Sequence, residues 1–411
     1  MNRSRLMVFI ACILVIGLGQ AVATPTTPLD LAIAVENNNA FAVDLYGQLK
    51  TQPGNLFFSP ESISTALAMT YAGARGETAA EMAKTLHFTQ LPEILHPAMS
   101  ALLHDLNATH DGYQLAVANA LWVQSDFHLR DDFMNLESAN YKSAIYSVDF
   151  KNAAEAARQQ INGWVQRQTE NKIKDLIMPG VLNSETRLVL TNAIFFKGAW
   201  MTSFLKEDTT VEDFHLSSTE IVKIPLMHLT DVFNYFDGGT FQMLELPYEK
   251  NELSMRIFLP KDANGLAALD ESMRTNMKTC SRKEMSPRHV TVTMPRFRME
   301  GRFDLKGTLQ RMGMGQAFDE QRADFTGMAP RTEMQYGNLF IGAMIHKAYV
   351  DVNEQGTEAA AVSAVTIKHT RIVPKPPPPV DFRADHPFLF LICNNRFGDI
   401  LFMGRMMNPS F

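Results

Sequence analysis

The feature that most constrains the fold is the segment 354–373, EQGTEAAAVSAVTIKHTRIV, which contains no glycine or proline after Gly356. From residue 357 to 368 its alternate positions form two sets. One set holds only small or apolar uncharged side chains, and both charges, Glu358 and Lys368, fall in the other. Successive residues of a strand face opposite sides of a sheet, so the pattern predicts a segment that can become a central β-strand. An Ala-rich amphipathic helix is the alternative, and the β-branched run at 365–367 weighs against it.

The N-terminal residues 1–23 have the three-part pattern of a secretory signal peptide. Two arginines precede an apolar run at 6–19, and a small-x-small site, AVA, ends at Ala23. The alternative is a membrane anchor, but fourteen apolar residues are short for a span of ~20. We therefore expect export after cleavage near Ala23, either to the extracellular space or to the periplasm of a Gram-negative bacterium. Residues 24–411 are then expected to form one domain.

Composition and motifs exclude several classes of function. The net charge of −6, without a strong basic block, argues against nucleic acid as the partner. No further apolar run is long enough to span a membrane, and three cysteines are too few for a disulfide scaffold. Outside the signal peptide, Cys280 and Cys393 could pair, but buried free thiols are the expectation.

No nucleophile elbow, phosphate loop, H-E-x-x-H or C-x-x-C motif is present, so we predict no enzyme, metal site or cofactor. Asn107 begins a possible glycan acceptor, Asn-Ala-Thr.

Local patterns predict helices in the first half of the chain and strands later. Ser59 and Pro60 suit the start of a helix, and Thr78 with Glu81 has the spacing of a capping box. An amphipathic helix is expected over 153–169. Strands are expected at Tyr113 to Val123, Arg187 to Phe196, His289 to Met294 and Phe388 to Cys393. The fold class that follows is α+β with a largely antiparallel sheet.

Five ordered stretches, spread over essentially the whole mature chain, carry a resemblance to a known family. They are NLFFSPESISTALAMTYAGARGET (55–78), LVLTNAIFFKGAW (188–200), HKAYVDVNEQGTEAAA (346–361), FRADHPFLFLI (382–392) and ILFMGRMMNP (400–409). In these stretches the chain resembles the serpins, the serine protease inhibitor superfamily. The resemblance implies a monomeric serpin fold with about nine helices packed on three β-sheets. Its five-stranded central sheet would accept a reactive-centre loop as an extra strand.

The resemblance also implies a mechanism, in which a protease cleaves the loop at 354–380 and forms an acyl-enzyme. Insertion of the cleaved loop into the central sheet then traps the protease. The expected targets are trypsin-like or elastase-like serine proteases, and papain-like cysteine proteases are a further option. The hinge of the loop corresponds to Glu354, Gln355, Gly356, Thr357, Glu358, Ala359, Ala360, Ala361 and Val362. Val362 is larger than the family prefers and would slow insertion. The alternative is a non-inhibitory carrier or chaperone, but such members usually have a degraded hinge and this one is intact.

Two groups of residues are implied to control insertion. Trp200, Arg296 and Glu354 correspond to the breach, the top of the central sheet where the loop enters. A polar cluster beneath the strands that must part, the shutter, corresponds to Ser59, Ser62, Asn192 and His346.

The position of the cleaved bond follows from counting along the loop. Seventeen residues from Glu354, counting that residue, put the bond between Thr370 and Arg371. The Arg371–Ile372 bond is the second choice, because a trypsin-like pocket requires a cation. Lys368 would also attract such a protease, whereas 365–367 would suit an elastase-like one. The proline-rich run at 374–379 is expected to form a stiff extended spacer.

Heparin activation in this family uses basic residues on an early helix. Here Lys84 is followed by no lysine or arginine until Arg130, so the sequence argues against heparin as a cofactor.

Overall fold

The computed structural model describes residues 26–409 with the exceptions of 109, 111, 143, 277–281, 331–337 and 358–377. The predicted signal peptide, Cys280, the hinge from Glu358 to Val362 and both candidate reactive bonds lie outside the described residues. The first four hinge residues, Glu354, Gln355, Gly356 and Thr357, lie within them.

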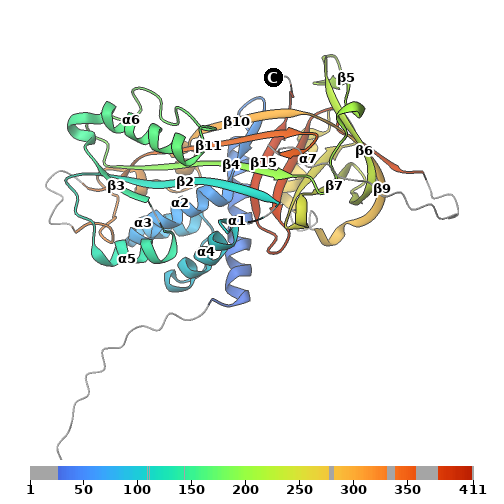
Figure 1. The fold of residues 1–411 in the computed structure, drawn as a ribbon. Helices are drawn as coiled ribbons and strands as arrows, with labels where there is room; N and C mark the ends of the chain where they lie inside the picture. Colours follow the sequence, from blue (N-terminus) through green and yellow to red (C-terminus); the bar gives the residue numbers. More distant parts are fainter. Residues whose placement is uncertain are drawn as a thin grey trace, which may run out of the picture.

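The described residues contain eight α-helices, six of which precede residue 169. They are α1 Pro28–Leu49, α2 Pro60–Gly73, α3 Gly76–Thr85, α4 Pro92–Leu106, α5 Asp131–Asn140, α6 Phe150–Gln168, α7 Leu266–Asn276 and α8 Lys306–Arg311. Figure 1 shows α6 on one face of a central sheet and α1 to α5 gathered on the other. The predicted clustering of helices in the first half of the chain is confirmed.

The central sheet has the five main strands that the resemblance implied, in the order β3, β2, β4, β11 and β10. Their bounds are β2 Tyr113–Gln124, β3 Ala144–Val148, β4 Leu188–Ala199, β10 Phe297–Asp304 and β11 Ile341–Asn353. β4 and β11 pair directly and in parallel along most of their length. At one end a two-residue strand, β12 Gly356–Thr357, lies between them and is antiparallel to both.

The other strands form one nine-stranded sheet, where two sheets were expected. Its strands are β1 Leu56–Phe58, β5 Thr210–His215, β6 Ile221–Asp237, β7 Phe241–Pro247, β8 Leu253–Pro260, β9 Ser286–Pro295, β13 Val380–Arg383, β14 Phe388–Asn394 and β15 Ile400–Met406. The two halves are continuous because β6 has 17 residues and pairs with both β9 and β7. In both sheets most pairings are antiparallel, as predicted.

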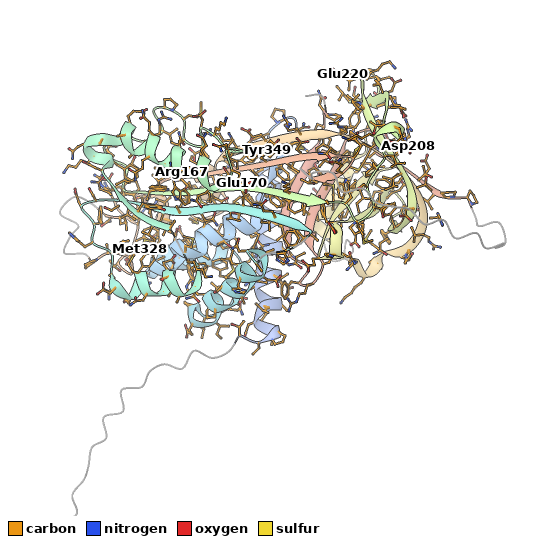
Figure 2. The ribbon with its side chains drawn as sticks, viewed as in Figure 1. Arg167, Glu170, Asp208, Glu220, Met328 and Tyr349 are labelled. Atoms are coloured by element: carbon orange, nitrogen blue, oxygen red, sulfur yellow. The ribbon has the colours of Figure 1, made fainter. Side chains whose placement is uncertain are left out.

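The core lies on both faces of the central sheet, and Figure 2 shows side chains filling the space between the layers. On β4, Val189 and Phe195 pack toward α6, where Ile161 and Val165 are fully buried. Leu190 points to the opposite face and joins the cluster that includes α2. Burial of β4 on both faces explains why its sequence is a nearly continuous apolar run.

The predicted helix start at Ser59 is confirmed, because its side chain accepts a hydrogen bond from the Ser62 N–H at 3.2 Å. The predicted capping box is wrong. α3 begins at Gly76, and the Thr78 hydroxyl accepts instead from the Asp324 N–H at 3.0 Å. The Glu81 carboxylate likewise accepts from a distant backbone N–H, that of Gln316, at 2.7 Å. Tertiary contacts have taken the side chains that a local cap would have used.

The four predicted strands correspond to β2, β4, β9 and β14, and the helix predicted at 153–169 corresponds to α6. Cys393 is buried and free, in agreement with its predicted state.

Candidate functional site

The candidate site is the seam between β4 and β11, which begins where β12 separates their ends. Gly356 of β12 pairs with Ala199 on one side and Asn353 on the other. Its φ of +146° and the 2.1 Å from an ideal Cβ to the Gly198 carbonyl oxygen leave no room for a side chain. Thr357 follows it into the sheet and is fully buried. Gly356 and Thr357 of the hinge are therefore already inserted between the ends of β4 and β11.

Trp200, one of the predicted breach residues, lies beside this entry point. Its indole packs flat on Tyr248, with ring centroids 4.6 Å apart, and its Nε1 donates to the Asn353 carbonyl at 3.0 Å. Its backbone N–H donates to the Gln355 carbonyl at 2.9 Å. Tyr248 was missed in the sequence, although its hydroxyl lies 2.8 Å from the Thr357 hydroxyl. Burial raises the pKa of Tyr248, so its hydroxyl keeps its proton for this contact.

Glu354 is buried at the base of the hinge, with 3 % of its surface exposed. The Thr209 hydroxyl donates to one carboxylate oxygen at 2.9 Å, and Arg296 Nε lies 3.6 Å from the other. The structure thus brings together the three implied breach residues, Trp200, Arg296 and Glu354. Because the Arg296 side chain is 45 % exposed, its ion pair is screened by water and holds the hinge weakly.

The middle of the seam is crossed by a row of polar side chains. Asn119 of β2 lies opposite Asn192 of β4, which lies opposite His346 of β11. His346 contacts the Asn192 side-chain oxygen through Nδ1, and its Nε2 accepts from the Ser59 N–H at 3.1 Å. Burial lowers the pKa of His346 to about 3, so the ring is neutral and can accept at one nitrogen while it donates at the other.

The start of α2 completes this polar cluster. Asn192 Nδ2 donates to the Ser62 carbonyl at 2.7 Å, and the Ser59 hydroxyl donates to the Leu401 carbonyl of β15 at 2.6 Å. Ser59, Ser62, Asn192 and His346, implied as a shutter, are in direct contact. Asn119 was missed. The sequence feature that could have indicated Asn119 is its polar side chain in the middle of the apolar run that forms β2.

Two buried carboxylates lie next to this cluster, and the sequence did not indicate them. Glu61 and Asp399 each stand two residues from the bonded pair Ser59 and Leu401. Oε2 of Glu61 and both side-chain oxygens of Asp399 are buried without a hydrogen-bond partner. Burial raises the pKa of Glu61 to about 7. Burial, together with the neighbouring Glu61, raises the pKa of Asp399 well above its usual range.

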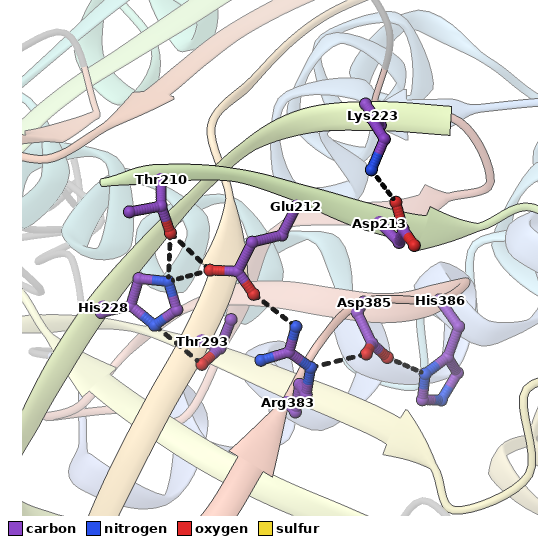
Figure 3. A network of polar contacts seen from close by, with 9 residues as sticks. All are labelled: Thr210, Glu212, Asp213, Lys223, His228, Thr293, Arg383, Asp385 and His386. Carbon is purple, nitrogen blue, oxygen red and sulfur yellow. Dashed lines mark hydrogen bonds and ion pairs between the residues drawn. The ribbon is translucent and has the colours of Figure 1, made fainter. Parts of the chain in front are cut away.

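A surface network holds the strand that follows residues 358–377, as Figure 3 shows. Arg383 of β13 donates to Glu212 of β5 at 2.5 Å and to Asp385 at 2.8 Å. Glu212 also lies 2.6 Å from His228 of β6, whose other ring nitrogen is 3.1 Å from the Thr293 hydroxyl of β9. Four strands of the nine-stranded sheet are thereby linked around β13.

The structure also bears on the predicted glycan acceptor at Asn107, on metal sites and on membrane-spanning helices. Asn107 is exposed at the C-terminal end of α4, whereas Thr109 of its acceptor motif lies outside the described residues. In the part of the chain that the structure describes, no group of three or more His, Cys, Asp or Glu side chains could hold a metal ion. Over the same residues, no helix is both long and apolar enough to cross a membrane.

Comparison with known proteins identifies the family. The family model described as serpin, serine protease inhibitor, matches residues 36–409. The chain therefore belongs to the serpin family, whose members are characterised as protease inhibitors rather than enzymes.

Individual relatives and solved structures agree. The chain is 39 % identical to the horse leukocyte elastase inhibitor, over 90 % of this chain and 98 % of the relative. It is 41 % identical to a serpin-like protein of Thermococcus kodakarensis, over 90 % of this chain and 85 % of that protein. Among solved structures, Serpin48 of the insect Tenebrio molitor has a TM-score of 0.82 at 32 % identity, covering 93 % of this chain and 99 % of that one. These relatives support proteases as the targets of this chain.

Proposed function

We propose that this chain is a secreted suicide inhibitor that traps serine endopeptidases as covalent acyl complexes. The observation that carries the proposal is β12, which has begun an additional strand at the end of the β4–β11 seam. The protease would cleave a bond in 358–377, and its catalytic serine would remain esterified to the new C-terminal carboxyl group. Insertion of the hinge would then carry the attached enzyme along the sheet.

The energetics of insertion support this mechanism. About 15 residues at ~3.3 Å each would move the cleaved end by roughly 50 Å. Each new ladder hydrogen bond contributes ~1 kcal/mol net, and buried apolar side chains add to that. Thr357 is the first member of the uncharged set, and its side chain already faces Tyr248 in the core. Continued insertion in the same register would turn the other small residues of that set inward and leave both charges on the other face.

The loop sequence supports two types of target. Counting along the loop favours cleavage at Thr370–Arg371. Cleavage at Arg371–Ile372, after a cation, would suit a trypsin-like enzyme, and the apolar residues at 365–367 would suit an elastase-like one. The similarity to the horse leukocyte elastase inhibitor favours including elastases among the candidates. Papain-like cysteine proteases form comparable acyl intermediates and extend the list. We further propose that the protein acts as a monomer.

Secretion is supported by the signal-like pattern of residues 1–23, which lies upstream of the family match at 36–409. Expression of the full chain in a secreting host should yield a product in the medium whose N-terminus is near Thr24. Retention of the intact N-terminus in the cell would contradict this part of the proposal.

The inhibitory mechanism is tested by incubating the purified chain with trypsin, an elastase and papain. We expect a complex that survives SDS electrophoresis with at least one of the serine proteases. N-terminal sequencing of the C-terminal fragment released by the cleavage would identify the reactive bond. A panel in which every protease cleaves the loop and stays active would overturn the proposal.

The alternative, a non-inhibitory carrier or chaperone, makes a different thermal prediction. An inhibitor should gain a large increase in melting temperature when its loop is cleaved and inserted, because the uncleaved fold is metastable. A carrier would show no such increase. Thermal unfolding before and after limited proteolysis therefore separates the two.

A further inference from the structure

The hairpin formed by β5 and β6 has one face that is exposed to solvent. The register of the two antiparallel strands places six side chains on this outer face: Val211, Asp213, His215, Ile221, Lys223 and Pro225. Val211 is 66 % exposed and Ile221 is 51 % exposed, whereas Phe214 and Ile224 on the opposite face are buried in the core. Among the described strands β5 pairs only with β6, so one edge of the hairpin is also free.

Exposed apolar side chains are concentrated in this hairpin and in the segment that leads into it. Nine large apolar side chains are exposed among the described residues, and four of them fall within 201–221: Met201, Leu205, Val211 and Ile221. Single exposed apolar residues are ordinary, but a group of them on one part of the surface marks a contact site for another molecule.

The same stretch is acidic. Residues 201–223 contain five carboxylates and two lysines. One of these lysines, Lys223, pairs with Asp213 at 2.7 Å, as Figure 3 shows. Glu207, Asp208 and Glu220 are exposed, and Figure 2 shows the last two at the end of the molecule that carries β5. The partner that complements this surface therefore has a cationic surface of its own.

Residues just before and within β5 bind the chain on both sides of 358–377. On one side, the Phe204 N–H donates to the Glu354 carbonyl at 2.9 Å. On the other side, Arg383 donates to Glu212 at 2.5 Å. The hairpin thus lies at the end of the molecule where the loop leaves the fold and returns to it.

A protease that cleaves the loop must come close to this hairpin. Arg371, which takes part in both candidate reactive bonds, is nine residues from the start of β13, or at most ~32 Å of extended chain. A protease domain of about 220 residues is roughly 40 Å across. Its surface would reach the neighbourhood of β5, which Glu212 and Arg383 link to β13.

We propose that the outer face of the β5–β6 hairpin, together with Glu207 and Asp208, is a second contact surface for the protease held on the loop. This inference rests on the proposed function, since it takes the protease as the partner. Apolar contact with Val211 and Ile221 would slow dissociation, and the carboxylates would attract a cationic rim and speed association. The surface would select, among trypsin-like proteases, those with a cationic surface.

The test uses cationic and anionic trypsin, two forms that share a preference for arginine and lysine and differ in surface charge. Surface plasmon resonance measures their association and dissociation rates with the full mature chain. The catalytic serine of each trypsin is replaced by alanine, so that docking is measured without cleavage. At low ionic strength we expect cationic trypsin to associate at least fivefold faster than anionic trypsin, and the difference to shrink in roughly 0.5 M salt.

Two double variants separate local charge from net charge. Glu207→Gln combined with Asp208→Asn should slow the association of cationic trypsin at least threefold. Glu185→Gln combined with Glu320→Gln removes the same charge from exposed positions elsewhere and is the matched control, with less than a twofold effect expected. Equal association rates for the two double variants would show that only net charge matters and would overturn the proposal.

The apolar part of the surface is tested by Val211→Ser, which should raise the dissociation rate of cationic trypsin at least threefold. Leu91→Ser, at a position that is 62 % exposed before α4, is its control and should leave the rate unchanged. An unchanged dissociation rate in Val211→Ser, or no measurable binding of cationic trypsin to the wild type, would overturn the proposal.

Failure of the proposed function would give a different result. Active trypsin would then cleave the loop without forming an SDS-resistant complex, whereas the inactive trypsin would still bind and would still respond to the substitutions in the hairpin. If the complex forms but the hairpin variants bind as the wild type does, the proposed function stands and the second contact surface is excluded.

Discussion

The end of the β4–β11 seam at the breach and the middle of the seam are held together in different ways. At the breach, β12 already separates β4 from β11, and the hinge is held by backbone pairing, Trp200 and the hydroxyl of Tyr248. In the middle, β4 and β11 bond directly, and the polar cluster around His346 and Asn192 connects them to α2. The breach is therefore ready to admit more of the loop, whereas the middle must break buried hydrogen bonds before it can open.

This difference assigns separate roles to the two regions. Under the proposed mechanism, residues at the breach would determine whether the loop can enter, because each inserted side chain must fit a site that is already formed. Residues at the shutter would determine how costly further opening is, because buried polar groups would lose their partners if the strands separated. Substitutions in the two regions should consequently affect different measurements.

The largest expected effect is at the breach, from Thr357→Arg. The substitution would place a charge in a fully buried site beside Tyr248, so the inserted strand could not form. We expect the yield of SDS-resistant complex to fall at least tenfold, with the variant cleaved as a substrate. Thr357→Ser, which keeps the hydroxyl, is the control. Full complex yield from the arginine variant would show that insertion through this site is not required.

At the shutter, His346→Ala should lower the free energy of unfolding by about 4 kcal/mol. The Ser59 N–H would lose its acceptor and the Asn192 oxygen its donor, and each unpaired buried group costs ~1–3 kcal/mol. Urea unfolding of the uncleaved protein measures the change. His104→Ala, at an exposed position of α4, should be nearly neutral. Equal changes in unfolding free energy for the two substitutions would show that the His346 hydrogen bonds stabilise the fold no more than an exposed side chain does.

The buried acids predict an unusual pH dependence of the shutter region. Because the pKa of Glu61 is raised to about 7 in the folded state, its charged form penalises folding above that pH. Stability from this group is therefore lost as pH rises from about 4.5 to 7. Glu61→Gln should stabilise the protein by up to about 3 kcal/mol at pH 8 and by little at pH 5.

Thermal unfolding at both pH values checks this, with the exposed Glu77→Gln as the control. His346 makes the stability of the fold depend on pH in the opposite direction. Since its pKa is lowered to about 3, it reduces stability as pH falls below about 6.5. A Glu61→Gln variant with the same pH profile as the wild type would contradict the assignment of Glu61.

The smallest expected effect is that of Arg296→Gln at the breach. The guanidinium is 45 % exposed and 3.6 Å from Glu354, so its loss should cost less than about 1 kcal/mol of unfolding free energy. Thr209→Val removes the closer donor to the same carboxylate and should cost more. If the arginine variant were the less stable of the two, the ion pair would be the main support of the hinge.

Much of the fold followed from local patterns, because they report burial. The apolar runs now seen as β2, β4 and β14 and the Ser59 helix start needed no tertiary information. The capping box failed because Thr78 and Glu81 found partners more than 200 residues away. Asn119, Tyr248 and the Glu61–Asp399 pair were missed for a similar reason, since their roles depend on neighbours distant in the chain.

By itself, the sequence determined which segment can become a strand, since the separation of charged from uncharged positions after Gly356 is a local property. Family resemblance then indicated the seam that would receive it. Only the tertiary structure decided how far the hinge has entered and which side chains hold the seam closed. The physical reason is that these features are balances of desolvation and pairing among side chains that only folding brings into contact.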